Sequence, residues 1–156
     1  MNTHTGKELV YAALGGAGEI GLNCYLYGLG QASGGRWIMV DCGIGFGDME
    51  TAPGVELVLP RIDFIRDQAD RLDALFLTHA HEDHVGAIAH LWQAFDAPIY
   101  ARAFTAEVVR RKLDEAGLDT SIVREVEVGE RIRAGDMEVE FRSEEHTSEL
   151  QSHAPI

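Results

Sequence analysis

The feature that most constrains the fold is a run of glycines between two strand-like segments near the start of the chain. Gly16, Gly18 and Gly21 fit the pattern G-x-G-x-x-G, which in dinucleotide-binding proteins joins a strand to a helix. The residues after Gly21 read LNCYLYGLG, where Asn, Cys and two tyrosines alternate with leucines as in a strand. A strand here leaves no helix N-terminus for a pyrophosphate. The glycines therefore predict a turn between two strands.

The neighbouring segments extend this turn into a β-meander. ELVYAAL before the glycines and RWIMVD after a second loop both have the composition of strands. Asp41, which ends RWIMVD, lies about 20 residues beyond the glycines, where dinucleotide-binding proteins carry a ribose-binding acid. Because a meander offers no such site, a dinucleotide-binding protein is the least favoured hypothesis, and we expect no dinucleotide cofactor.

Short strands and helices alternate along the rest of the chain. DALFLT and PIYA are predicted strands, whereas VGAIAHLWQAF and FTAEVVRRKLDEAG have helical spacing. Thr105 can cap the second of these helices, and Gly117 ends it. IVREVEV, ERIR and DMEVEF are predicted strands around a turn at Gly135 and Asp136. The fold class is therefore α/β, with helices and strands in layers (α+β layered).

Composition is that of a single globular domain without membrane segments. The 156 residues make about one domain, and no apolar run approaches the ~18 residues that cross a bilayer. The N-terminal MNTHTGKELV lacks the pattern of a signal peptide. Cys24 and Cys42 are too few for a disulfide scaffold, so we expect reduced thiols and a cytoplasmic location.

The net charge of −13 restricts the possible partners. It argues against nonspecific nucleic-acid binding through a basic face. It does not exclude a nucleic-acid enzyme, because bound metal ions can supply the positive charge.

Four metal-ligand side chains, His79, His81, Asp83 and His84, form the motif H-x-H-x-D-H directly after DALFLT. Histidines at i and i+2 of an extended segment project to the same side and can hold one ion. Asp83 and His84 follow the turn and can face a second ion, and they are the predicted catalytic residues. Two metals about 4 Å apart suit a displacement at phosphorus or carbon. We therefore predict two divalent cations, for which these donors suit zinc and tolerate manganese.

Residues around the motif are predicted to support it. Asp41 can accept a hydrogen bond from a ligand histidine and fix its tautomer; the alternative is a turn-forming aspartate. Thr78 is predicted to bond locally to the loop backbone and to support the ligands beside Asp41. Glu82 should point away from the ligands, and His90 is predicted to be structural. Cys42 is predicted to be a buried, inert thiol.

These residues resemble the metallo-β-lactamase fold and, within it, the ribonuclease J family. The motif alone identifies only the superfamily, which includes thioester and lactam hydrolases as well as nucleases. The likeness to ribonuclease J runs from Glu8 to about Phe141, and Ala80 stands where many members have glycine. It rests, in chain order, on LGGAGEIGLN, WIMVDCGIGFGD, PGVELVLPRIDFI, LFLTHAHEDHVGAIAHL, PIYARAFTAEVVRRKLDEAGL and VREVEVGERIRAGDMEVEF.

The resemblance implies roles for the motif residues. His79 and His81 would ligate one metal, Asp83 and His84 the other, and Asp41 would be the supporting carboxylate. The implied activity is metal-dependent hydrolysis of RNA phosphodiesters, both endonucleolytic and 5′-to-3′ exonucleolytic, by a cytoplasmic and homo-oligomeric parent protein. The implied fold is an αββα sandwich with a β-CASP domain inserted later, and this chain would be the N-terminal half of the sandwich.

The end of the chain departs from the family pattern. RSEEHTSELQSHAPI has no strand periodicity and no apolar face, and it resembles the translation of a sequencing-library adapter. We therefore assign residues 1–141 to the N-terminal part of a metallo-β-lactamase-like domain and residues 142–156 to a non-native tail. His146 in this tail is not counted as a ligand. A third ligand histidine and a bridging acid would then be missing, so each metal would keep two protein ligands.

This truncation has two expected consequences, and two alternative functions stay open. We expect an inactive chain and an exposed apolar sheet face, because the second half of a sandwich would normally bury that face. One alternative is another hydrolase of the same fold, such as a glyoxalase II-like thioesterase. The other is a non-catalytic, truncated metal-binding module, which requires a genuine tail. The LGGAGEIGLN and PGVELVLP segments favour the nuclease.

Overall fold

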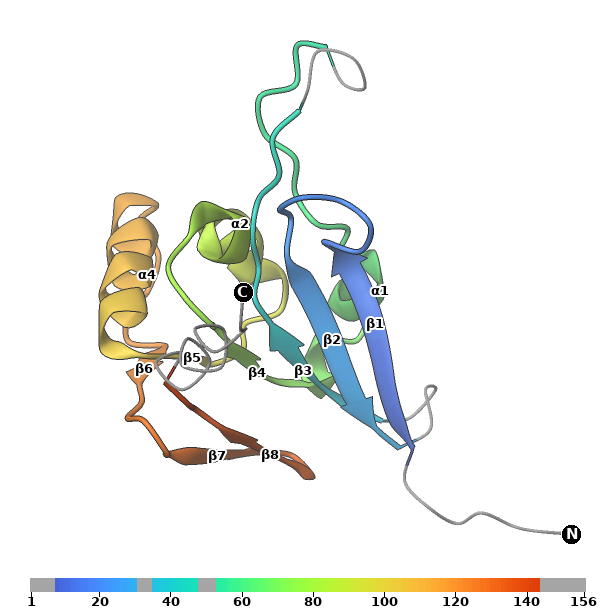
Figure 1. Cartoon of the computed structure of the whole chain (residues 1–156), viewed down its shortest axis with the longest axis vertical. Helices are drawn as coiled ribbons and strands as arrows, with labels where there is room; N and C mark the ends of the chain where they lie inside the picture. Colours follow the sequence, from blue (N-terminus) through green and yellow to red (C-terminus); the bar gives the residue numbers. More distant parts are fainter. Residues whose placement is uncertain (1–7, 31–34, 48–52, 144–156) are drawn as a thin grey trace, which may run out of the picture.

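A mixed sheet organises the chain in the computed structural model, which describes residues 8–30, 35–47 and 53–143 (Figure 1). In these residues the sheet has six strands in sequence order: β1 (Leu9–Gly15), β2 (Cys24–Leu29), β3 (Arg36–Val40), β4 (Leu72–Phe76), β5 (Ile99–Ala101) and β6 (Val123–Glu125). Strands β1 to β3 are antiparallel neighbours, and β3 to β6 are parallel. The predicted β-meander is therefore confirmed.

The glycine run forms the turn between β1 and β2. Gly16, Gly18 and Gly21 have φ angles of 78°, 81° and 82°, in the left-handed region that glycine adopts without a steric penalty. The next element after Gly21 is strand β2. The G-x-G-x-x-G pattern is thus a strand-to-strand turn, as the sequence predicts.

Helices cover one face of the sheet and enclose the main core. They are α1 (Asp63–Arg66), η1 (Ala69–Arg71), α2 (Glu82–Val85), α3 (Ile88–Leu91), η2 (Trp92–Ala94) and α4 (Ala103–Glu115). Alternate strand residues point to this side, as the two-residue period of a strand requires. The core includes Leu26, Trp37, Met39, Leu75 and Ile99 from the sheet, and Ile65, Ile88, Val109 and Leu113 from the helices.

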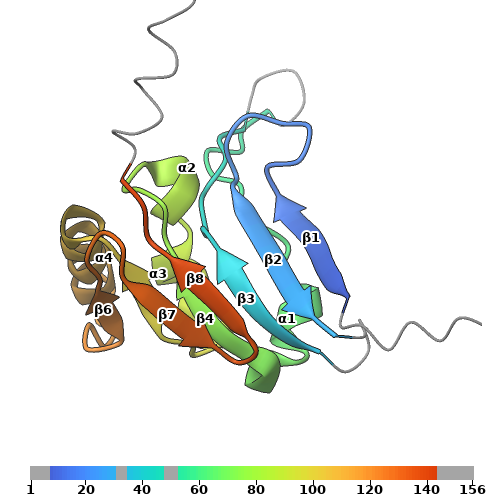
Figure 2. The ribbon, with the colours of Figure 1, turned by 60° about the horizontal axis from the view of Figure 1, so that its bottom comes forward.

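A hairpin covers part of the opposite face. Strands β7 (Arg131–Ala134) and β8 (Met137–Glu140) pair antiparallel around the predicted turn, where Gly135 has a φ of 58°. The hairpin lies over β4 in Figure 2, and its apolar side packs on the sheet. This second core includes Ile38, Ala74, Phe76 and Ala134, with Ile132, Met137, Val139 and Phe141 packed against it.

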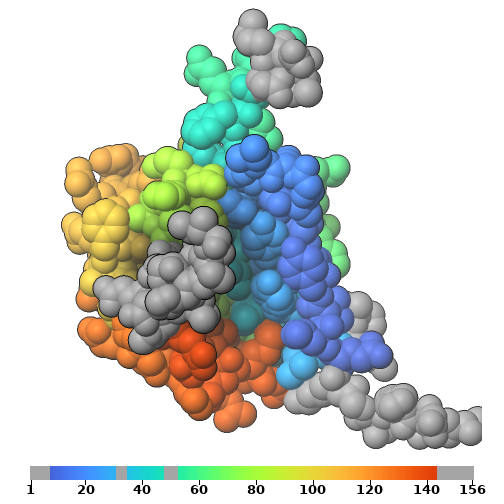
Figure 3. Space-filling model, in the orientation of Figure 1, coloured from blue at the N-terminus to red at the C-terminus, as the bar shows by residue number. Residues whose placement is uncertain are grey.

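The same face stays open over β1 and β2. Leu9 and Tyr11 are 67% and 54% exposed, and the Tyr11 ring packs beside Tyr25 and Tyr27, with centroids 6.0 and 5.3 Å away. In the space-filling view, the blue surface of these strands lies uncovered beside the orange and red hairpin (Figure 3). The expected exposed apolar face is therefore present on these two strands.

Two details of the helical prediction are wrong. Thr105 does not cap α4, because the N-cap is Arg102 and Thr105 is buried at 4% exposure within the first turn. The segment VGAIAHLWQAF was predicted as one helix but contains the end of α2, then α3 and η2. The helical hydrogen-bond pattern is interrupted at Ala87, whose N–H donates to Cys42 O at 3.0 Å and not to the preceding turn of the helix.

Two further points concern membrane helices and the chain terminus. None of the helices in the described ranges is long and apolar enough to span a bilayer. Most of the predicted tail, including His146, lies outside the described residues. Its assignment as non-native stays a prediction.

Candidate metal centre

The centre lies where the parallel strands β3 and β4 end. Val40 and Phe76 are paired across these strands, and the N–H of Asp41 donates to Phe76 O at 2.9 Å. Because parallel strands bring their carboxyl ends to one edge of a sheet, Asp41 lies beside the segment that carries the motif. Asp41 and the histidine motif, which are far apart in the sequence, therefore lie close together.

Backbone hydrogen bonds join three segments at this edge: residues 22–23, residues 42–44 and residues 82–87. The bonds are Asn23 N to Asp83 O (2.9 Å), Gly43 N to Asn23 O (2.9 Å), Cys42 N to His84 O (2.8 Å) and Ile44 N to Glu82 O (3.0 Å). The carbonyl groups of α2 thus bond to neighbouring loops, which explains why the helix is short. The same bonds fix the backbone that carries Asp83 and His84.

Asp41 is the central acceptor of this edge. It is buried at 2% exposure and has a φ of 60°, a conformation that Asp tolerates better than most residues. Its carboxylate accepts the Thr78 N–H (2.9 Å), the Thr78 hydroxyl (2.9 Å) and the Nδ1–H of His84 (2.8 Å). The Thr78 hydroxyl thus bonds to Asp41, directly after β3, where the sequence predicts a bond to the local loop backbone.

These bonds determine the tautomers of two histidines. An ionised carboxylate only accepts hydrogen bonds, so His84 carries its proton on Nδ1 and leaves the Nε2 lone pair for another partner. The Thr78 hydroxyl gives its single proton to Asp41, so at 3.0 Å it accepts from Nδ1 of His79. Nε2 of His79 then also carries a lone pair, as a metal ligand requires.

The histidine rings of the motif lie together. The His79 ring centroid is 4.6 Å from that of His81 and 4.0 Å from that of His84. Nε2 of His84 lies 3.5 Å from Oδ2 of Asp83. Two ligands about 2.1 Å from a tetrahedral zinc ion stand about 3.4 Å apart. Asp83 and His84 are therefore spaced as ligands of one cation.

The described residues supply only part of a coordination shell. Among them, no three His, Cys, Asp or Glu side chains converge so as to hold one ion. A cation at Asp83 and His84 would take its other ligands from water or from groups outside the described ranges. The assignment of the motif residues to metal ligands stays a prediction that this spacing supports.

Asn23 belongs to the site, although the sequence analysis did not single it out. Its Nδ2 lies 3.1 Å from Oδ2 of Asp83 and 3.1 Å from Nε2 of His84. Its Oδ1 accepts the hydroxyl of Tyr25 at 2.7 Å; burial, together with Tyr11 and Asp41, raises the pKa of that hydroxyl. The available signal was a polar residue placed directly between the glycine turn and the next strand.

Two other residues lie close to the proposed ligands in the sequence. The Glu82 carboxylate points to Lys112 on α4, with 2.6 Å between Oε1 and Nζ, as expected for a side chain directed away from the ligands. His90 is exposed on α3, and its predicted structural role stays a prediction.

The Cys42 thiol should be unreactive in the folded chain. The side chain is fully buried, and its hydrogen bond with Cys24 and its burial raise the thiol pKa well above the usual value. A raised pKa keeps the nucleophilic thiolate scarce at mildly alkaline pH. Ellman's reagent should therefore release little thionitrobenzoate from the native protein and react with both cysteines in urea. Fast release before urea is added would show that the thiols are accessible.

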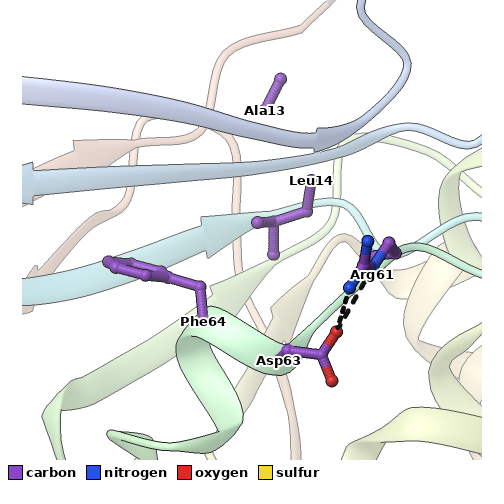
Figure 4. A pocket seen from close by; sticks show the side chains of 5 residues that line it. All are labelled: Ala13, Leu14, Arg61, Asp63 and Phe64. Atoms are coloured by element: carbon purple, nitrogen blue, oxygen red, sulfur yellow. Dashed lines mark hydrogen bonds and ion pairs between the residues drawn. The ribbon is translucent and has the colours of Figure 1, made fainter.

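A separate depression lies between β1 and α1. It measures about 420 Å³ and is lined by Ala13, Leu14, Arg61, Asp63 and Phe64 (Figure 4). Arg61 binds the Asp63 carboxylate at 3.2 Å, and Arg61 with Arg66 lowers the pKa of that carboxyl. No motif residue lines this depression, and its two charged groups already pair with each other. The candidate functional site is therefore the edge that carries the histidine motif, and not this depression.

Comparisons with known proteins agree with this geometry. The chain matches the metallo-β-lactamase superfamily over residues 17–152. Ribonuclease J of Sinorhizobium meliloti is 44% identical over 145 residues, which are 90% of this chain and 25% of that protein. Ribonuclease J of Mycobacterium tuberculosis is 37% identical over 145 residues, which are 92% of this chain and 25% of that protein. The chain thus spans about a quarter of the length of these relatives.

Solved structures show the same fold. The metallo-β-lactamase SMB-1 aligns with a TM-score of 0.52 and 21% identity, over 85% of this chain and 49% of that protein. MEM-A1, a subclass B3 metallo-β-lactamase from a soil metagenome, gives a TM-score of 0.50 and 22% identity, over 78% and 46%. The predicted fold class and the resemblance to ribonuclease J are therefore confirmed. The chain belongs to the metallo-β-lactamase superfamily.

Proposed function

We propose that this chain is part of a metal-dependent ribonuclease of the ribonuclease J type. In this proposal His79 and His81 hold one divalent cation, and Asp83 and His84 hold a second. The observation that carries it is the 3.5 Å spacing of Asp83 Oδ2 and His84 Nε2, in a chain 44% identical to a ribonuclease J. The relatives by themselves support a hydrolase of the nuclease type.

The side chains of this edge prepare the ligands for such a reaction. Divalent cations held here would stabilise the charge that develops on phosphoryl oxygens. Nδ1 of His84 donates its proton to Oδ2 of Asp41 at 2.8 Å, which leaves the Nε2 lone pair for a cation. Thr78 connects the same carboxylate to His79. One buried acid thereby orients a ligand of each proposed cation, and the donor set suits zinc and accepts manganese.

RNA is the proposed substrate, and cytoplasm the proposed location of a homo-oligomeric parent protein. The net charge of −13 gives this chain little attraction for a phosphate backbone. Bound cations and the remaining three quarters of the length of the relatives would have to supply the basic surface. We expect the 156-residue chain by itself to be inactive, because its described residues bring at most two donors to a cation.

The test uses the longer protein that contains this segment. Sequencing the source locus past the codon of Phe141 gives its reading frame; a stop codon directly after residues 142–156 would favour the metal-binding module. The purified protein should degrade single-stranded RNA in the presence of a divalent cation. His84→Ala and Asp83→Asn should each lower the rate of RNA degradation by more than roughly 100-fold. Loss of a residue that only hydrogen-bonds to a metal ligand lowers activity by up to about that factor.

The matched control is His90→Ala, an exposed histidine six positions after His84, which should leave the rate unchanged. Hydrolysis of a thioester such as S-lactoylglutathione, without hydrolysis of RNA, would favour the glyoxalase II-like thioesterase over the ribonuclease. Equal loss of activity in His90→Ala would show that the assay reports on folding and not on the motif.

A further inference from the structure

We propose that one side of α4 binds single-stranded RNA next to the histidine motif, with Phe104 stacking on a base and Arg111 contacting a phosphate. The side chains concerned are Phe104, Val108, Arg111 and Lys112, which we call the α4 strip. This inference rests on the proposed nuclease function and adds a substrate-binding surface to it. None of the four residues belongs to the proposed metal centre.

The α4 strip is one continuous side of the helix. Its residues stand at positions i, i+4, i+7 and i+8, which share a side of an α-helix, and α4 runs unbroken over Ala103–Glu115. Three of the four line a depression of about 190 Å³, whose lining consists of Glu82, Val108, Arg111, Lys112 and Glu115. The opposite side of α4 is buried in the main core. The strip is therefore the side of α4 that is open to a ligand.

The α4 strip lies beside the segment that carries the proposed ligands. Nζ of Lys112 is 2.6 Å from Oε1 of Glu82, which is itself a residue of the motif. At the start of the segment, Tyr100 O accepts the N–H of Leu77 at 2.9 Å. Because β4 and β5 are parallel neighbours, the motif and α4 follow the carboxyl ends of adjacent strands. An RNA strand bound along α4 would therefore pass the motif.

Phe104 presents its ring to solvent from a well-anchored backbone. The residue is 76% exposed and lies in the first turn of α4, where Ala106 N–H donates to Arg102 O at 2.8 Å. The guanidinium of Arg102 in turn donates to Val126 O at 2.8 Å and to Glu127 at 3.0 Å. An exposed aromatic ring on a fixed support suits base stacking, which accepts any unpaired base because each base has a π face.

The charge around the α4 strip differs from that of the rest of the chain. Residues 102–124, which include α4, carry five Lys or Arg and four Asp or Glu, so their formal charge is +1 in a chain of −13. Lys112 is paired with Glu82. Arg111 is exposed and has no ion pair among the residues that the structure describes, although Glu115 lines the same depression one turn further on. One free guanidinium and one ring therefore match one phosphate and one base.

The first test measures RNA hydrolysis by the longer protein that contains this segment. Phe104→Ala should raise KM for a single-stranded oligoadenylate at least about fivefold, as expected for loss of a stacking contact, without changing kcat or the urea midpoint. Phe104→Trp should restore KM. The matched control is Phe64→Ala, at an exposed phenylalanine of α1, which should change KM by less than about twofold. Equal KM values of Phe104→Ala and Phe64→Ala would overturn the inference while RNA hydrolysis continues. If the unaltered protein hydrolyses no RNA, the proposed function itself fails.

An oligomer of the same length with abasic riboses tests whether the ring contacts a base. It has the phosphates but no bases, so Phe104→Ala should leave its KM unchanged within about twofold. A rise of KM for the abasic oligomer equal to that for oligoadenylate would show that the ring acts through the fold. A change of oligomeric state in Phe104→Ala with unchanged KM would assign the ring to a protein interface. Either result overturns the inference.

The second test concerns the phosphate contact. In Arg111→Gln the slope of log KM against log salt concentration should fall by about 0.7, the value for one phosphate contact of a single strand. Arg61→Gln removes a guanidinium whose side chain is 89% exposed near α1 and should leave the slope unchanged. Equal slopes of the two variants would show that Arg111 contacts no phosphate, and the proposed surface would be wrong.

Discussion

Asp41→Ala lowers the free energy of unfolding by about 3 kcal/mol, because it removes a buried carboxylate and leaves three part-buried hydrogen-bond donors without their acceptor. In the native protein the carboxylate accepts two bonds from Thr78 and one from His84, and the residue is only 2% exposed. Alanine supplies no oxygen to accept these three bonds. Urea unfolding followed by circular dichroism measures the change as a lower midpoint.

Two further variants separate this effect from a general loss of charge. Asp67→Ala removes a carboxylate whose side chain is 78% exposed and 3.9 Å from Arg66, so it should change stability by less than about 0.5 kcal/mol. Asp41→Asn keeps the shape of the side chain and one acceptor oxygen, but its NH₂ group faces a hydrogen-bond donor. The urea midpoint of this variant should therefore fall between those of the other two. An Asp41→Ala midpoint equal to that of Asp67→Ala would mean that Asp41 does not organise the edge.

Local patterns in the sequence were sufficient to predict the scaffold of the site. The alternation in LNCYLYGLG identified β2, because a strand displays its two faces with a period of two residues. That single assignment distinguished a glycine turn in a meander from a dinucleotide-binding turn. The motif at 79–84 was likewise readable from spacing, and the strand before it placed the motif at the edge of the sheet.

Contacts between distant segments were not predictable in the same way. Thr78 and Asp41 are 37 residues apart, so the hydroxyl of Thr78 was assigned a partner in its own loop. The helix after the motif breaks at Ala87, because Cys42 O takes its N–H. Neither the composition nor the helical period of VGAIAHLWQAF predicts that the carbonyl oxygen of Cys42 accepts this bond. Asn23 is not predictable as a site residue from a repeating pattern, because it is a single amide beside glycines and its partners lie 60 residues further on.

Gly43→Ala should destabilise the chain by at least about 3 kcal/mol, because the added Cβ meets backbone that cannot rotate away. A Cβ at this position would overlap the carbonyl group of Asp83 and stand 2.6 Å from the nitrogen of His84. Relief requires residues 42–44 to separate from residues 82–87, which breaks the bonds of Cys42 and Ile44 to that segment. Urea unfolding gives the loss of stability.

Gly45→Ala is the matched control, two positions further along the same loop. A Cβ there would lie 3.5 Å from Leu22 Cβ, an ordinary van der Waals contact, so stability should change by less than about 1 kcal/mol. Zn²⁺ affinity should follow the same order, falling in Gly43→Ala and holding in Gly45→Ala, because only the first change breaks the backbone bonds that hold the segment carrying Asp83 and His84. If Gly43→Ala were as stable as Gly45→Ala, the close crossing of these two segments would not exist in solution. The segment that carries Asp83 and His84 would then lose its backbone support from residues 42–44.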